Sequence, residues 1–222
     1  IRSPLTSIQA YVEGLLDGVA KTPAAQRRYL ETIKTKAENL RHIVSQLFLF
    51  SQTELGEYPE DVRPLRLDRA IREIVDANRA EYARRGLSVQ LELAAAEIDA
   101  DPLQIYRVVT NILENSLKYK DRETGTVLVR LERVRRSCRL TFLDDGPGVP
   151  AEALPHLFEV FYRSDPARRN PEQDSGLGLA IVSNIIRRMG GAAEAFSGTP
   201  HGLGIRIYLP EGATAHEENP DR

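Results

Sequence analysis

The first fifty residues place apolar side chains at helical spacing. Between Leu5 and Leu16 the apolar positions recur three or four residues apart, which predicts an amphipathic helix that ends at Asp17-Gly18. Thr22-Pro23 is typical of an N-cap followed by the first residue of a second helix. The apolar positions of this second helix are Leu30, Ile33, Ala37, Leu40, Val44 and Leu47. They alternate three and four apart, which is the spacing of a coiled-coil seam.

Two such helices joined by a short loop predict an antiparallel helical hairpin. The apolar seam of a single hairpin would stay in contact with water, so we expect two copies to pair into a four-helix bundle through residues 5–50. The alternative is a hairpin whose seam packs on the second domain of its own chain. The pattern therefore predicts a homodimer, with a hairpin packed within one chain as the second possibility.

The segment from Ser51 to Pro64 loses the helical period and gains glycine, proline and charge, which is typical of a linker. Beyond it, apolar and polar residues alternate in short runs that predict strands. These runs are residues 89–93, 127–131, 138–142 and 205–209. The middle two are close enough in sequence to form a hairpin.

Further helices are predicted between the strands. Asp68 is expected to cap the first of them, and Asp101-Pro102 to open a second that runs to about Tyr119. Gly190-Gly191 is expected to close a third. Helices interleaved with hairpin-linked strands favour the α+β class, with helices on one face of a mixed sheet. We expect a hairpin domain at residues 1–57, a second domain at residues 62–212 and a tail at residues 213–222.

Composition narrows the classes of function. The 222 residues carry a formal net charge of -2, so no basic field favours nucleic acid or acidic lipid. Cys138 is the only cysteine, which excludes an intramolecular disulfide or a cysteine-based zinc site and fits a cytoplasmic location. No stretch reaches the roughly 18 apolar residues that a membrane span needs. Because the chain begins inside a helix, with Pro4 in its first turn, we expect any membrane attachment to come from a part upstream.

The helix that begins at Asp101-Pro102 carries polar residues on one face. Asn111, Asn115 and Lys118 recur four and three apart, so two carboxamides and an ammonium group project from the same side. A carboxamide oxygen is a hard ligand that suits Mg²⁺, which takes the rest of its shell from water and phosphate. The alternative is a pair of solvated surface asparagines.

A glycine-rich turn follows the strand that ends at Leu143. It begins with Asp144, a carboxylate at a strand end that can accept a hydrogen bond from an amino group such as adenine N6. The glycines of the turn, Gly146 and Gly148, allow the backbone to approach a flat ring closely. An ordinary glycine turn is the alternative.

A second glycine-rich motif, residues 175–179, opens the helix that ends before Gly190. Glycines at a helix N-terminus expose unpaired N–H groups that attract phosphate. The sequence has no G-x-x-x-x-G-K-[ST] and no strand leading into G-x-G-x-x-G, so P-loop and Rossmann folds are disfavoured. Between the two glycine motifs, a polar stretch from Ser164 to Asp174 is interpreted as a lid over the site, or as an ordinary long loop.

These motifs resemble those of the histidine kinase family over nearly the whole chain. Residues 111–119 are similar to the N box, residues 144–148 to the first glycine box, residues 158–161 to the F box and residues 175–179 to the second glycine box. The resemblance implies a dimerising helical hairpin followed by a two-layer α/β sandwich of the kind found in histidine kinases, gyrase and chaperone ATPases.

The resemblance also implies roles for individual residues. Asn115 would bind Mg²⁺ with help from Asn111, and Lys118 would contact phosphate. Tyr119 would pack near the adenine, whose N6 amino group would donate to Asp144. The other residues implied to bind ATP are Gly146, Gly148, Val149, Phe158, Arg163, Ser175, Gly176, Leu177, Gly178 and Leu179.

The first five residues are similar to the tail of the family's H box. The resemblance implies that the phosphoacceptor histidine and the acidic residue after it would lie directly before Ile1, so the chain as given is not expected to phosphorylate itself. The histidines present are His42, His156, His201 and His216, and none occupies that place. Ser3 stands where the family often has threonine or asparagine, at the position linked to hydrolysis of the regulator's phosphoaspartate.

The expected function is a two-step phosphotransfer that uses ATP and Mg²⁺. A histidine on the hairpin would receive the γ-phosphoryl group, and an aspartate in the receiver domain of a response regulator would take it next. Glu114 is a candidate base toward the histidine, or else a solvated helix carboxylate. An ATPase machine of the same fold class is disfavoured, because Asn111 stands where those enzymes carry a glutamate that activates water. A non-catalytic ATP-binding scaffold and a phosphatase acting on the regulator remain open as rival functions.

Overall fold

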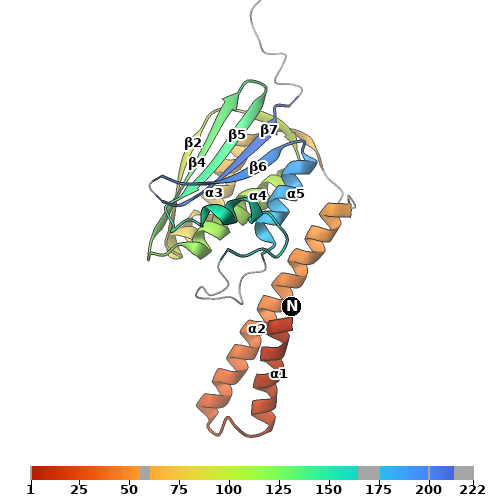
Figure 1. Cartoon of the computed structure of the whole chain (residues 1–222), viewed down its shortest axis with the longest axis vertical. Coiled ribbons are helices and arrows are strands. Elements are labelled where there is room, and N and C mark those ends of the chain that lie inside the picture. The colour runs from red at the N-terminus through yellow and green to blue at the C-terminus, as the bar shows by residue number, and fades with distance from the viewer. Residues whose placement is uncertain (1, 56–60, 165–175, 200, 213–222) are drawn as a thin grey trace, which may run out of the picture.

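The hairpin predicted for the first fifty residues is present. The computed structural model describes residues 2–55, 61–164, 176–199 and 201–212. Helices α1 (Arg2–Leu16) and α2 (Pro23–Leu55) lie side by side and are joined by a short turn (Figure 1). Thr22 Oγ1 accepts a hydrogen bond from the Ala25 N–H at 3.1 Å, which confirms the N-cap of α2.

Helix α2 is longer than the sequence pattern predicts. It continues to Leu55, so the prediction that a linker begins at Ser51 is wrong. The residues after Ser51 include no glycine or proline before Gly56, and nothing in them breaks a helix. Pro64, predicted to lie in the linker, belongs to a short strand instead. No helix in the described ranges, α2 with its 33 residues included, combines the length and apolarity needed to cross a membrane.

The second part of the chain is built on a mixed five-stranded sheet. Its strands, in spatial order, are β2 (Leu87–Leu93), β4 (Gly125–Val134), β5 (Ser137–Asp144), β7 (Leu203–Pro210) and β6 (Ala192–Ser197). Strands β2 and β4 are parallel, and the other neighbours are antiparallel. A separate antiparallel pair joins β1 (Arg63–Arg66) to β3 (Glu97–Ala100). The four strands predicted from alternation are confirmed, and β1, β3 and β6 are additional.

Helices α3 (Leu67–Arg84), α4 (Pro102–Tyr119) and α5 (Gly178–Arg188) cover one face of the sheet (Figure 1). Buried apolar side chains from the helices and the strands form one core cluster, which includes Ile112 of α4, Phe142 of β5 and Ile185 of α5. A short 3-10 helix, η1 (Ala151–His156), follows β5. The layered arrangement confirms the α+β class and places the end of β5 close to the helix layer.

The N-terminus of α3 differs from the prediction. The helix begins at Leu67, so Asp68 lies in its first turn and is not the N-cap. The Asp68 carboxylate instead pairs with Arg66 at 3.0 Å and accepts the Ala96 N–H at 3.3 Å. Negative charge in a first helical turn is favourable with the helix dipole. At α4 the prediction is confirmed, because Asp101 accepts the Leu103 N–H at 2.8 Å.

The apolar seam of α2 is divided between two surroundings. Its C-terminal part contacts α5, and Leu47 and Phe50 pack against the core of the second domain. Further along the hairpin, Leu16, Leu30 and Val44 are 80%, 57% and 51% exposed. The packing of α2 on its own chain, the second possibility for the hairpin, therefore accounts for one end of the seam, while Leu30 and Val44 stay open to solvent.

Gly86 and Gly190 both have positive φ, but only Gly86 is crowded by other atoms. Alanine at the two positions therefore separates backbone strain from steric overlap. Gly86 has φ 77°, and a Cβ there would overlap the carbonyl oxygen of Glu123, whereas Gly190 has φ 71° with its nearest neighbour, Pro210 Cγ, at 3.9 Å. We expect Gly190→Ala to cost about 1 kcal/mol from backbone strain alone, and Gly86→Ala about 3 kcal/mol because overlap adds to the strain. Urea unfolding of both variants measures the difference, and equal costs would contradict this reading of the turn.

Candidate functional site

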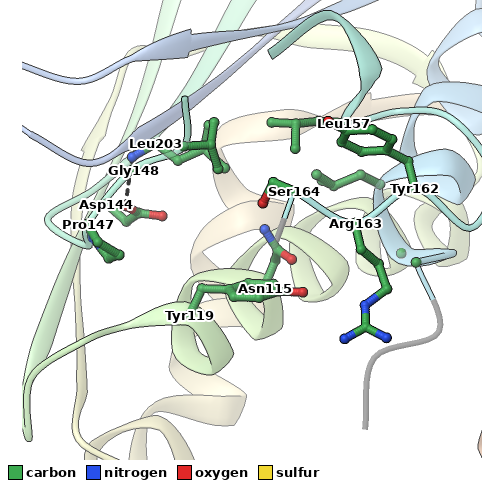
Figure 2. A pocket seen from close by; sticks show the side chains of 14 residues that line it. Asn115, Tyr119, Asp144, Pro147, Gly148, Leu157, Tyr162, Arg163, Ser164 and Leu203 are labelled. Atoms are coloured by element: carbon green, nitrogen blue, oxygen red, sulfur yellow. Dashed lines mark hydrogen bonds between the residues drawn. The ribbon is translucent and has the colours of Figure 1, made fainter. Parts of the chain in front are cut away.

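A pocket lies where β5 ends beside the helix layer (Figure 2). Residues from α4, from the turn after β5, from the segments on either side of the predicted lid and from the start of β7 line it. They are Asn115, Tyr119, Asp144, Pro147, Gly148, Val149, Leu157, Tyr162, Arg163, Ser164, Gly176, Gly178, Leu179 and Leu203. The pocket thus joins segments that are far apart in sequence.

Most of the residues predicted to bind ATP lie around this pocket. Those that line it are Asn115, Tyr119, Asp144, Gly148, Val149, Arg163, Gly176, Gly178 and Leu179. Those that do not are Asn111, Lys118, Gly146, Phe158 and Leu177. Ser175 lies outside the described residues, and so does the side chain of Ser3. The structure therefore brings the N box, both glycine motifs and the F-box region to one place.

Asp144, the last residue of β5, makes three hydrogen bonds with its carboxylate. Oδ1 accepts the N–H of Gly146 at 3.1 Å. It also accepts the N–H of Leu203 at 2.8 Å, the bond drawn in Figure 2. Oδ2 accepts the hydroxyl of Ser116, on α4, at 3.2 Å. Burial raises the pKa of the Asp144 carboxyl above its ordinary value, although the three hydrogen bonds act in the opposite direction. The carboxylate joins β5, α4 and β7 at a single point.

The polar face of α4 is shared between the pocket and α5. Asn115 and Tyr119, one turn apart, both face the pocket (Figure 2). Asn111 donates to a backbone carbonyl of its own helix at 2.7 Å, and its Oδ1 lies 3.2 Å from where a Cβ on Gly178 would be. Lys118 Nζ lies 5.3 Å from the centroid of the Tyr119 ring. Both asparagines are partly buried, which disfavours the alternative of two solvated surface residues.

The start of α5 forms another side of the pocket. Leu177, which precedes it, is buried, and its apolar side chain offers no acceptor to the first N–H groups of the helix. Gly176 has φ 64°, and a Cβ there would lie 2.8 Å from the backbone of Phe161. Phe161 N–H also donates to the Gly176 carbonyl at 3.0 Å. This close approach of two backbone segments holds the F-box region beside the second glycine motif.

Glu114 does not line the pocket. Both of its carboxylate oxygens accept from Arg85 Nη1 at 3.0 Å, which ties the side chain to the end of α3. The carboxylate is half-exposed. This placement favours the alternative of a solvated helix carboxylate in an ion pair.

Several residues of the pocket were not predicted from the sequence. They are Pro147, Leu157, Tyr162 and Leu203, whereas Ser164 is the first residue of the predicted lid. Pro147 stands between the two glycines of the first glycine box, and Tyr162 directly follows the F box, so both had a signal close by in sequence. Leu203 had none, because the turn before β7 reaches the pocket only through the order of strands in the sheet.

The two histidine side chains that the structure describes, those of His156 and His201, do not line the pocket. His156 Nδ1 lies 2.6 Å from a carboxylate oxygen of Glu159, and His201 Nδ1 lies 3.2 Å from the Gly146 carbonyl. The side chain of His42 and all of His216 lie outside what the structure describes. Within the described ranges, no group of three or more His, Cys, Asp or Glu side chains is placed to hold a metal ion. Among the residues that line the pocket, Asn115 offers a carboxamide oxygen, a ligand that suits Mg²⁺ together with phosphate and water.

The geometry defines a class of nucleotide-binding domain, in which a strand-end carboxylate, a helix asparagine and a glycine-opened helix surround a pocket on an α/β sandwich. Residues 100–213 match the family described as histidine kinase-, DNA gyrase B-, and HSP90-like ATPase. Residues 1–56 match the His Kinase A (phospho-acceptor) domain. The chain belongs to the histidine kinase family.

Individual relatives agree with this assignment. The chain is 31% identical to the sensor protein ChvG of Agrobacterium fabrum over 98% of its own length, but it spans only 38% of ChvG. The mycobacterial sensor histidine kinase MprB is 30% identical with a TM-score of 0.60, over 68% of this chain and 99% of that one. The histidine kinase ThkA, solved in complex with the response regulator protein TrrA, has a TM-score of 0.71 over 98% of this chain and 60% of that one. At 20% identity, the last comparison shows the fold alone.

Asp144→Asn tests the burial of the carboxylate, because the difference in stability between the unaltered protein and this variant should depend on pH. The folded-state pKa of this carboxyl is raised above its ordinary value of 3.8. The carboxyl therefore contributes stability that is fully present below pH 3.8 and is lost as the pH rises through the folded-state pKa. The unaltered protein should therefore gain stability relative to Asp144→Asn as the pH falls from about 7.5 toward about 4. Urea unfolding at several pH values measures this difference. A difference that stays constant with pH would contradict the assignment.

Proposed function

We propose that this chain is the cytoplasmic, ATP-handling core of a sensor histidine kinase. ATP and Mg²⁺ bind in the pocket beside α4, the γ-phosphoryl group passes to a histidine on the hairpin, and an aspartate of a response regulator receives it. The observation that carries the proposal is the pocket itself. Asp144, Asn115 and the start of α5 converge on it, in a chain whose N-terminal part matches a phospho-acceptor domain.

Adenine recognition rests on Asp144. Its Oδ2 carries a single hydrogen bond from the described residues and can accept another from the N6 amino group of adenine. A charge-assisted hydrogen bond of this kind is worth about 1.5–3 kcal/mol. Tyr119 and Val149 line the same pocket and offer apolar surface for the flat base. The positive φ of Gly148, 70°, belongs to the turn that borders this surface.

Phosphate recognition rests on the start of α5 and on cations near it. The N–H groups at Gly178 and Leu179 open a helix, where phosphate is favoured by the dipole. Arg163 lines the pocket, and Lys118 extends from the next turn of α4 after Asn115. The Asn115 carboxamide oxygen suits Mg²⁺, which when bound would neutralise phosphate charge. Asn111, one turn earlier on α4, assists Asn115 in holding the ion.

The transfer step forms a bond between an imidazole nitrogen and the γ-phosphorus. The bond from that phosphorus to the bridging oxygen breaks, ADP leaves, and the imidazole gives up its proton. Glu114 serves as base only after its ion pair with Arg85 opens, because that pair holds the carboxylate against the end of α3. We therefore assign catalysis mainly to the positioning of the two reactants and to charge neutralisation.

The second step needs a protein partner with an aspartate acceptor. ThkA, a kinase whose fold this chain shares, was solved with a response regulator, which supports a receiver domain as the partner here. Ser3 keeps a hydroxyl at the position linked to phosphoaspartate hydrolysis, so phosphatase activity toward the same regulator is a secondary proposal. A non-catalytic scaffold is disfavoured, because the pocket keeps both Asp144 and Asn115.

A labelling experiment tests the kinase proposal. The chain extended before Ile1 by a histidine and an acidic residue, incubated with γ-labelled ATP and Mg²⁺, should incorporate label that is labile in acid and stable in base. The chain as given should bind ATP and incorporate none. Asn115→Ala should slow labelling of the extended chain at least about 100-fold, because the charge stabilisation supplied by a metal is worth several kcal/mol.

Asn78→Ala is the matched control for this experiment. Asn78 is also a helix asparagine, but its Nδ2 donates to the Ile74 carbonyl on α3 at 2.8 Å and it does not line the pocket. Its loss should leave the labelling rate within about twofold. Absence of label on the extended chain would contradict the kinase proposal. Label on the chain as given would assign the acceptor to another histidine, with His42 the first candidate.

The homodimer through residues 5–50 is supported by the exposed part of the hairpin. Large apolar side chains of both helices remain in contact with water there, and they are Leu5, Val12, Leu16, Leu30, Val44 and Phe48. Exposed apolar side chains gathered on one part of a protein indicate that another apolar surface covers them. A second hairpin provides one with the same spacing and closes a four-helix bundle.

Val44→Asp tests the dimer. The side chain is half-exposed in a single chain, so the change should leave the fold intact and separate the two copies, since a charge in a bundle core costs several kcal/mol. Ser45→Asp places the same charge at the neighbouring exposed position and should keep the dimer. Light scattering at micromolar concentration gives the mass of each. An unaltered chain that is monomeric, or a dimeric Val44→Asp variant, would refute this assembly.

A further inference from the structure

Ser116 occupies a position on α4 whose side chain points away from solvent. It directly follows Asn115, and only 7% of the residue is exposed. A serine inside a helix commonly bonds back to the carbonyl four residues earlier. Thr110, on the same helix, does so, with its Oγ1 donating to the Tyr106 carbonyl at 2.8 Å. Ser116 Oγ instead donates across to Asp144 Oδ2, at 3.2 Å.

We propose that Ser116 is a positioning residue that makes the nucleotide pocket selective for a base with an amino group, by fixing the Asp144 carboxylate in one orientation. The inference rests on the proposed function, in which Asp144 accepts from adenine N6. It adds a residue that contacts Asp144 and has no role of its own in the phosphoryl transfer.

The acceptor capacity of the Asp144 carboxylate limits which ligand groups can lie beside it. Each carboxylate oxygen has two lone-pair directions. At Oδ1 both are used, by the N–H groups of Gly146 and Leu203. At Oδ2 the Ser116 hydroxyl uses one, so one acceptor direction remains in a residue that lines the pocket. A ligand group that donates a hydrogen bond can bind to this remaining lone pair of Oδ2. A carbonyl oxygen at the same place would be repelled, because both oxygens carry negative partial charge.

The Ser116 hydroxyl also acts on the charge of Asp144. Burial raises the pKa of this carboxyl and the neighbouring Asp145 charge does the same, while the bonds from Leu203, Gly146 and Ser116 lower it. Loss of the Ser116 bond therefore raises the pKa of Asp144 further. The carboxylate would then take up a proton at a higher pH, and its charge-assisted bond to an amino group would weaken there.

Binding of ADP and inosine diphosphate tests the proposal, because inosine has an oxygen where adenine has its amino group. Calorimetry on the full chain at about pH 7.5 should show that Ser116→Ala weakens ADP binding about tenfold, which is about 1.4 kcal/mol. Inosine diphosphate binding should change no more than about twofold, so the preference for ADP falls. Ser116→Thr keeps a hydroxyl and should restore the preference.

Thr110→Ala is the matched control, since it removes a hydroxyl from the same helix without touching Asp144. It should leave both affinities unchanged. A pH series adds a second readout. The ADP affinity of Ser116→Ala should decline at a higher pH than that of the unaltered protein, because the protonated carboxyl is the weaker acceptor.

The outcomes separate this inference from the proposed function. If the unaltered chain binds neither nucleotide, the proposed function fails. If it binds ADP with a preference over inosine diphosphate, and Ser116→Ala keeps the same preference and the same pH profile, the positioning role is overturned. Equal weakening of both nucleotides with an unchanged pH profile also overturns it, because Ser116 would then support only the packing of α4.

Discussion

The hydrogen bonds of the Asp144 carboxylate hold together parts of the chain that are distant in sequence. They tie the end of β5 to α4 through Ser116, and to the start of β7 through the Leu203 N–H. Because two of the donors are backbone N–H groups, the bonds fix the main chain of the turn after β5 and of the start of β7. A buried carboxylate disfavours folding at neutral pH unless something compensates it. Its presence at the edge of a pocket is therefore better explained by a ligand than by stability.

The elements that the sequence predicts well depend on residues close to one another in the chain. The cap at Thr22, and the limits of α4 from Asp101 to Tyr119, follow from local signals, and the structure agrees. The prediction for Asp68 was wrong because strand β1 pairs with β3 as far as Arg66, and the helix starts directly after this strand, two residues earlier than predicted. Strand β6 was not predicted because its alanine-rich sequence lacks the β-branched residues typical of strands.

The candidate site was predictable where a side chain provides the chemistry. Asn115 and Asp144 stand in recognisable motifs, and both line the pocket. Leu203 contributes its backbone N–H, which its side-chain identity does not reveal, and it reaches Asp144 only because β7 lies beside β5. Ser116 is similar, since its spacing on α4 indicates a buried face but not that the face meets the end of β5. Such contacts depend on sheet topology, which the local pattern leaves open.

The contact between α2 and α5 relates the hairpin to the pocket. Helix α5 has 11 residues, so about 16 Å separates its ends, and its first residue, Gly178, lines the pocket. Leu47 and Phe50 of α2 pack on the domain that contains it. These two apolar side chains leave the water-exposed row of the hairpin and join the core that α5 shares with the sheet. Under the proposed function, phosphate held at the start of α5 must reach an imidazole on the hairpin, and the contact between α2 and α5 is where these two parts of one chain meet.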